Sequence, residues 1–81
     1  MYSLIYSDRF FKQLSKLNKD LQKRIVSTLE RCRIRPYAHV KKLVDPYYSL
    51  RVGDYRIIMD IKEDKLFIFV IEVGHRKKIY K

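Results

Sequence analysis

The spacing of apolar residues changes near Pro36, and that change limits the folds that the chain can adopt. Before Pro36, apolar residues recur every three or four positions, as they do along one face of a helix; they are Phe10, Leu14, Leu17, Leu21, Ile25, Leu29 and Cys32. Beyond Val40, apolar and polar residues tend to alternate, as they do along a strand. Helices followed by strands predict an α+β domain.

The helical part divides into two amphipathic helices after a short first strand, YSLIY, at residues 2–6. Ser7 or Asp8 offers the N-cap of the first helix. That helix is interrupted near Asn18, and a second begins at about Lys19. Pro36 cannot continue a helix, so the second must end before it. The two helices are expected to form a hairpin.

The second half of the chain predicts four strands. The two residues Gly53-Asp54 suit the turn of a β-hairpin. Asp45-Pro46 ends the strand that precedes this hairpin. The expected strands are an edge strand at 39–44, then 47–52, 55–61 and the apolar segment 66–73. We therefore predict one domain spanning residues 1–81, in which an N-terminal strand and a two-helix hairpin pack on one face of an antiparallel β-sheet.

Alternation also predicts which side chains point away from the helices. If Tyr55 and Ile57 face the helices, then Arg56 projects from the open face of the sheet. Ser49 and Arg51 on the neighbouring strand project the same way. An uncovered sheet face that carries arginines is a platform for an anionic ligand.

The charge of the chain points to a polyanionic partner. Lys and Arg number 19 against 9 Asp and Glu, for a formal net charge of +10 on 81 residues. Nucleic acid is the commonest partner of so basic a domain. No apolar run is long enough to cross a bilayer, and we expect a cytoplasmic protein without membrane contact. Cys32 has no disulfide partner, and with two histidines, His39 and His75, no zinc ligand set can be assembled.

Two segments, LRVGDYRIIMDI at 50–61 and VGHRKKIY at 73–80, resemble the RelE/ParE superfamily of toxin–antitoxin toxins, and specifically its RelE branch. The resemblance covers essentially the whole chain, although the N-terminal half agrees only in pattern and length. It implies an mRNA interferase that enters the ribosomal A site and cuts the exposed codon. In that family the 2′-hydroxyl attacks the adjacent phosphodiester and leaves a cyclic phosphate, without metal or cofactor. The implied partners are the ribosome, mRNA and a RelB-like antitoxin with an amphipathic, acidic helix.

The resemblance assigns four candidate catalytic residues. Arg56 matches the arginine of the GDYR strand and would bind phosphate; alternatively, it is a surface arginine that pairs with Asp60. Arg76 matches the arginine of the V-G-x-R motif and would stabilise the transition state, with Gly74 letting the chain turn toward the sheet; alternatively, it belongs to a frayed basic tail. Tyr80 would orient the 2′-hydroxyl or stack on a base, or else anchor the tail. His75 would protonate the leaving group.

One departure from the family pattern leaves the general base open. Better-known members carry two lysines at alternate positions of the strand entering the hairpin, where this chain has Tyr47 and Ser49. Nearby cations could compensate, and Tyr47 could stack on a base. The residues expected to bind RNA are Arg51, Lys41, Lys42, Tyr47, Lys77, Lys78 and Lys81.

Two other functions remain open from the sequence. The ParE-like branch shares the fold and inhibits DNA gyrase, but it lacks the combination of Arg56, Arg76 and Tyr80. A non-catalytic module could also use a basic sheet simply to hold nucleic-acid phosphates.

Overall fold

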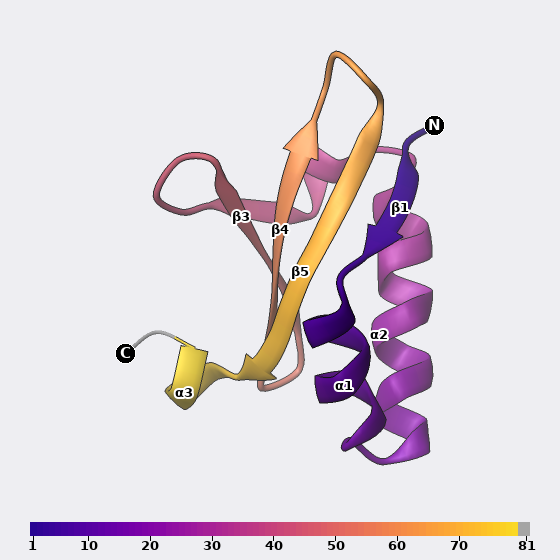
Figure 1. The fold of residues 1–81 in the computed structure, drawn as a ribbon, viewed down its shortest axis with the longest axis vertical. Coiled ribbons are helices and arrows are strands. Elements are labelled where there is room, and N and C mark those ends of the chain that lie inside the picture. The colour runs from indigo at the N-terminus through magenta and orange to yellow at the C-terminus, as the bar shows by residue number, and fades with distance from the viewer. Residues whose placement is uncertain (80–81) are drawn as a thin grey trace.

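The computed structural model describes residues 1–79, in which two long helices cover one face of a five-stranded sheet (Figure 1). The α+β class is confirmed, as is the order of a first strand, two helices and then the remaining strands; the 3-10 turn and the last helix were not predicted. The elements are β1 (Ser3–Tyr6), α1 (Asp8–Ser15), α2 (Lys19–Cys32), the 3-10 turn η1 (Pro36–Ala38), β2 (Val40–Lys42), β3 (Tyr47–Val52), β4 (Tyr55–Lys62), β5 (Phe67–His75) and α3 (Arg76–Ile79).

Side-chain caps fix where the two long helices begin. The Ser7 hydroxyl accepts the backbone N–H of Phe10 at 3.0 Å, and the Asn18 carboxamide accepts that of Leu21 at 2.8 Å. Each cap satisfies a backbone donor that has no partner inside its helix. The helices therefore start where the sequence predicts, and α2 ends at Cys32.

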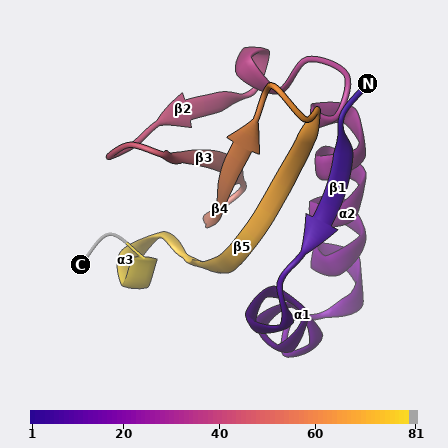
Figure 2. The same ribbon diagram turned by 45° about the horizontal axis from the view of Figure 1, so that its top comes forward.

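The sheet has the strand order β1-β5-β4-β3-β2, and its neighbours are antiparallel except for β1 and β5, which run parallel. The expected purely antiparallel sheet is therefore corrected to a mixed one. Figure 2 shows β1 lying along β5, at the edge opposite β2. The sequence pattern along β1 indicates which side chains share a face of the sheet, but not whether the neighbouring strand runs parallel or antiparallel. That direction is set by the pairing of β1 with β5, at the far end of the chain.

The core lies between the helices and the covered face of the sheet. Phe10 from α1 and Ile25 and Leu29 from α2 are completely buried. They pack in one cluster with sheet residues that include Ile57 and Met59. Burying each large apolar side chain contributes about 1.5–3 kcal/mol. The predicted face of β4 is confirmed.

A β-bulge in β5 changes which of its side chains face the helices. Ile58 lies opposite Glu72, whereas its neighbour Met59 lies opposite Val70, so β5 holds one extra residue at this point. Strict alternation from the buried Val70 would place residue 73 on the open face, yet Val73 is buried. Beyond the bulge every side chain of β5 therefore lies on the face opposite to the one that alternation predicts.

Candidate functional site

Two arginines meet on the open face of the sheet, close to the β3–β4 turn. Arg51 in β3 and Arg56 in β4 are directly opposite each other in the antiparallel register. Opposite residues place their side chains on the same face, and two like charges in this position destabilise the strand pair. An anion placed between them would remove that repulsion. The predicted projection of both side chains from one face is confirmed.

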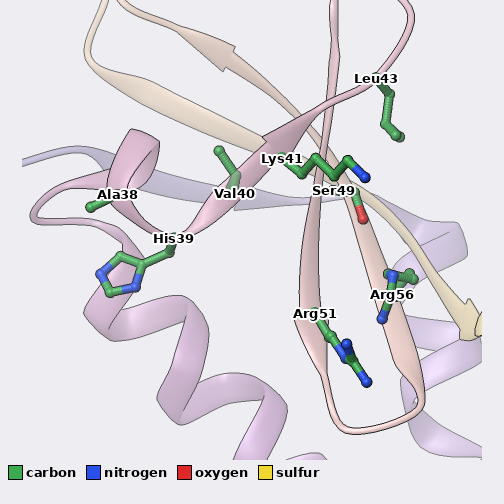
Figure 3. Close-up of a pocket in the computed structure, with 8 residues that line it drawn as sticks. All are labelled: Ala38, His39, Val40, Lys41, Leu43, Ser49, Arg51 and Arg56. Atoms are coloured by element: carbon green, nitrogen blue, oxygen red, sulfur yellow. The ribbon is translucent and has the colours of Figure 1, made fainter.

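Both arginines line a cavity of about 480 Å³ in this face. Figure 3 shows its lining, to which η1, β2, β3 and β4 all contribute. The lining residues are Ala38, His39, Val40, Lys41, Leu43, Ser49, Arg51 and Arg56. The guanidinium Nη1 of Arg56 is buried, while Arg51 is exposed. The cavity therefore offers one embedded cation and one solvent-facing cation to a ligand.

Lys41 enters this cavity from the edge strand. It lies opposite Ser49 in the β2–β3 register, and its side chain extends over Ser49 on the side of the cavity that also holds Arg56 (Figure 3). Ser49 is only 4 % exposed. Ser49 is one of the two β3 residues that stand where the resemblance led us to expect a lysine. The side chain of Lys41, from the neighbouring strand, covers it.

His39 is a lining residue that sequence reasoning did not select as a functional candidate. It directly precedes β2 and lies at the end of the cavity away from Arg56 (Figure 3). Its place next to a basic edge strand was the one signal that could have identified it.

Two hydrogen bonds hold the tip of the β3–β4 hairpin. Gly53 adopts a positive φ of 59°, which only glycine takes without strain. The Nε of Arg51 donates to the Gly53 carbonyl at 3.2 Å, and a Cβ at Gly53 would lie 3.7 Å from a guanidinium nitrogen of Arg24. The backbone N–H of Arg76 donates to the Asp54 carbonyl at 2.8 Å. Hydrogen bonds therefore tie this tip to Arg51 and to the start of α3, and Arg24 of α2 lies close to it.

The chain turns at Arg76, not at Gly74 as the sequence suggested. Gly74 lies inside β5, opposite Arg56, and Arg76 begins α3. β5 continues to His75, two residues beyond the end that the sequence predicted at Val73. The Arg76 side chain is exposed and is not among the residues that line the cavity.

His75 lies away from the two cavity arginines. The bulge places it opposite Tyr55, and the two rings meet edge to face with centroids 5.4 Å apart. Because Tyr55 packs against the core, His75 is directed to the helix-covered face. Its Nδ1 accepts the backbone N–H of Lys77 at 3.3 Å. His75 lines a separate pocket of about 400 Å³ with Gln13, Lys16, Leu17, Tyr55, Glu72, Val73 and Gly74.

The remaining predicted RNA-binding residues are scattered. Lys42 points to the face opposite Lys41, where its ammonium pairs with Asp45 at 3.2 Å and lies over the Tyr48 ring. The hydrogen bond to Asp45 raises the pKa of Lys42. Tyr47 is exposed but does not line the cavity.

Lys77 is exposed in α3. Lys78 lies in the same helix, but its side chain is outside what the structure describes, and Tyr80 and Lys81 lie outside the described residues altogether.

Asp60, which the sequence offered as an alternative partner for Arg56, forms an ion pair with Lys62. The Lys62 Nζ lies 3.0 Å from an Asp60 carboxylate oxygen. Within residues 1–79, no three His, Cys, Asp or Glu side chains gather as a metal site requires, and no helix there is long and apolar enough to cross a bilayer.

The family described as "ParE toxin of type II toxin-antitoxin system, parDE" matches residues 4–80. The chain is 32 % identical to the mRNA interferase toxin RelE of Escherichia coli K12, over 95 % of this chain and 85 % of that protein.

Solved structures of toxin–antitoxin complexes share the fold. The RelB-RelE complex of Methanococcus jannaschii contains a chain 30 % identical to this one, with a TM-score of 0.73 and 94 % of both chains covered. The RelBE2 complex of Mycobacterium tuberculosis contains a chain 22 % identical, with a TM-score of 0.85, covering 93 % of this chain and 98 % of that one.

Proposed function

The chain belongs to the RelE/ParE superfamily of type II toxin–antitoxin toxins, and from that membership and its basic cavity we propose that it is a ribosome-dependent mRNA endonuclease. It would enter the ribosomal A site in the cytoplasm and cut the codon there, and so inhibit translation. One observation carries the proposal. Arg51 and Arg56 stand opposite each other in an open cavity, where a phosphodiester can lie between them.

The cavity suits a phosphodiester in charge and in donor geometry. A guanidinium presents parallel N–H donors that match the non-bridging oxygens of a phosphate. The buried Nη1 of Arg56 supplies charge from a poorly solvated position, where its attraction for an anion is stronger than in water. The net charge of +10 would draw the protein to RNA before specific contacts form.

The reaction proposed is attack of a 2′-hydroxyl on the adjacent phosphorus, with loss of the 5′ oxygen. Negative charge builds on the non-bridging oxygens as the new P–O bond forms, and Arg51 and Arg56 would stabilise that charge. Arg76, tied through its backbone to the same hairpin, would add a third cation. Tyr80 is proposed to orient the 2′-hydroxyl or stack on a base.

We propose a RelB-like antitoxin as the protein partner. The related chains named above were crystallised with RelB antitoxins. On the open face of this sheet, Ile5 of β1 and Phe69 of β5 lie opposite each other and are 41 % and 40 % exposed. This pair would take the apolar side of an amphipathic helix, whose acidic side would meet the cavity arginines.

A second function, gyrase inhibition, is kept because the matching family is described as a ParE toxin. Its inhibitory action would need no cleavage chemistry in the cavity.

The two functions are separated by a pair of assays on the antitoxin-free protein. We expect primer extension to show cuts within codons when the mRNA is translated, and no cuts without ribosomes. The Arg56→Gln and Arg76→Ala proteins should cut far less. Intact mRNA in every lane, together with loss of gyrase supercoiling activity, would establish the alternative instead.

A further inference from the structure

We propose that Lys41 donates the proton that the departing 5′ oxygen needs, a role that rests on the proposed RNA cleavage. An alkoxide is a poor leaving group, so P–O bond breaking is accelerated when a positioned acid protonates it. The sequence suggested His75 for this task, but His75 faces Tyr55 on the helix-covered side of the sheet.

The residues that line the cavity leave few candidates for this acid. Arg51 and Arg56 remain charged and do not give up a proton at working pH. Ser49 lies almost wholly buried beneath Lys41, and a hydroxyl is a weak acid. His39 lies at the far end of the cavity (Figure 3). Lys41 carries a transferable proton and lies on the side that holds Arg56.

The strand register places the Lys41 ammonium next to the phosphate position. Lys41 is opposite Ser49, and Arg51, two residues farther along β3 on the same face, is opposite Arg56. Lys41 and Arg51 are therefore diagonal neighbours, which long side chains can bridge. A phosphate held between the arginines would have the Lys41 ammonium at its side.

The ammonium of Lys41 is also available for proton transfer. Within residues 1–79 Lys41 makes no ion pair, whereas the adjacent Lys42 is held by Asp45 and Lys62 by Asp60. Lys41 is exposed on a three-residue edge strand, so solvent can return its proton after each turnover.

The 2′ oxygen forms a bond to phosphorus and releases its proton to water, while the bond between phosphorus and the 5′ oxygen breaks. The 5′ oxygen takes a proton from the Lys41 ammonium, which leaves a 2′,3′-cyclic phosphate, a 5′-hydroxyl and a neutral lysine. Water then returns a proton to Lys41.

A substrate with sulfur in place of the bridging 5′ oxygen tests this role directly. A thiolate leaves without protonation, because a thiol, with a pKa of about 8.5, is a far stronger acid than the 5′-hydroxyl that forms from the oxygen linkage. Ribosomes would be programmed with synthetic mRNA that carries either the oxygen or the sulfur linkage at the cut position. Single-turnover rates would be measured for the wild-type, Lys41→Met, Lys41→Arg and Arg56→Gln proteins.

We expect both Lys41 variants to cut the oxygen-linked mRNA about 10²–10⁴-fold more slowly than the wild type. On the sulfur-linked mRNA they should approach the wild-type rate. Lys41→Arg retains the positive charge but cannot give up a proton, so it separates proton transfer from charge. Arg56→Gln should lose rate on both substrates. Lys65→Met removes one exposed lysine from the β4–β5 turn and should behave as the wild type.

Exchanging the residues at positions 41 and 49 tests whether a lysine on the neighbouring strand can restore cutting. Because Lys41 and Ser49 are opposite each other, the double variant Lys41→Ser, Ser49→Lys should regain part of the activity on the oxygen linkage. Equal loss on both linkages would make Lys41 a phosphate-binding residue and overturn the proposal, as would unchanged cutting by a folded variant. If the wild type fails to cut either mRNA on ribosomes, the proposed function itself is wrong.

Discussion

Arg51 and Arg56 stand directly opposite each other across the β3–β4 hairpin, on the open face of the sheet. Two like charges at such a position repel each other across the strand pair. The pair is explained if the site binds an anion, and this makes a prediction about stability as well as activity.

The Arg51→Gln protein should be more stable and less active than the wild type. Arg51→Gln also loses the hydrogen bond to the Gly53 carbonyl, but that bond is exposed, so water replaces it at little net cost. Relief of the repulsion should therefore raise the free energy of unfolding by about 0.2–1 kcal/mol at low salt, while mRNA cutting should fall about 10²-fold or more. Urea unfolding and primer extension measure the two effects. In about 1 M salt, where the Debye length is roughly 3 Å, the gain should vanish. Arg31→Gln, which removes an exposed arginine from α2, serves as the control, and an Arg51→Gln protein that is both less stable and fully active would contradict the idea.

Replacing His75 should have a smaller effect on cutting than replacing Arg56. Its ring packs edge to face on Tyr55, away from the arginine pair. His75→Gln should therefore retain most of the cutting rate, and Arg56→Gln should lose about 10²-fold or more. Equal losses in the two variants, measured in the same ribosome assay, would return His75 to the catalytic centre.

Gln13 holds the bulged part of β5 and should matter for stability. Its side-chain oxygen accepts the backbone N–H of Val73 at 2.7 Å. Gln13→Met leaves that partly buried donor without its acceptor, which should lower the free energy of unfolding by about 1–3 kcal/mol. Gln13→Glu keeps an oxygen at this position and should lose less. Urea titrations of the two variants would show no difference if the contact were unimportant.

The adjacent residues Phe10 and Phe11 offer a matched test of the core. Phe10 is completely buried, whereas Phe11 is 53 % exposed. Phe10→Ala should destabilise the protein by about 3–5 kcal/mol, and Phe11→Ala by about 1 kcal/mol or less. Thermal and urea unfolding of both variants would measure the contrast. Similar losses would mean that the described packing of α1 is incorrect.

Cys32 should make stability fall at alkaline pH. Burial raises the pKa of its thiol to about 11, above the value of about 8.5 in an unfolded chain. As the pH rises between these values, the unfolded chain releases its proton first, so the free energy of unfolding decreases. Cys32→Ala should lack this component. Iodoacetamide should label the native thiol slowly and the urea-unfolded thiol quickly.

Local patterns were sufficient for the elements and for the arginine face. Ser7 and Asn18 cap helices at the predicted places because capping depends on a few neighbouring residues. Alternation placed Arg51 and Arg56 on one face because the period of a strand is set by its own backbone. Family resemblance assigned a role to Arg56 from its motif, but not to Arg51.

The tertiary structure decided how these elements meet. Pairing in space put Lys41 opposite Ser49 and β1 parallel to β5, and a single extra residue in β5 moved His75 to the covered face. The contact that supports this bulge joins Gln13 and Val73, which are 60 positions apart in the sequence. The periodicity of a segment reports its own backbone, whereas register, bulges and strand direction depend on contacts between distant segments. For this reason the sequence by itself determined the helices, the strands and the arginine pair, and only the folded chain determined which cation and which histidine share their cavity.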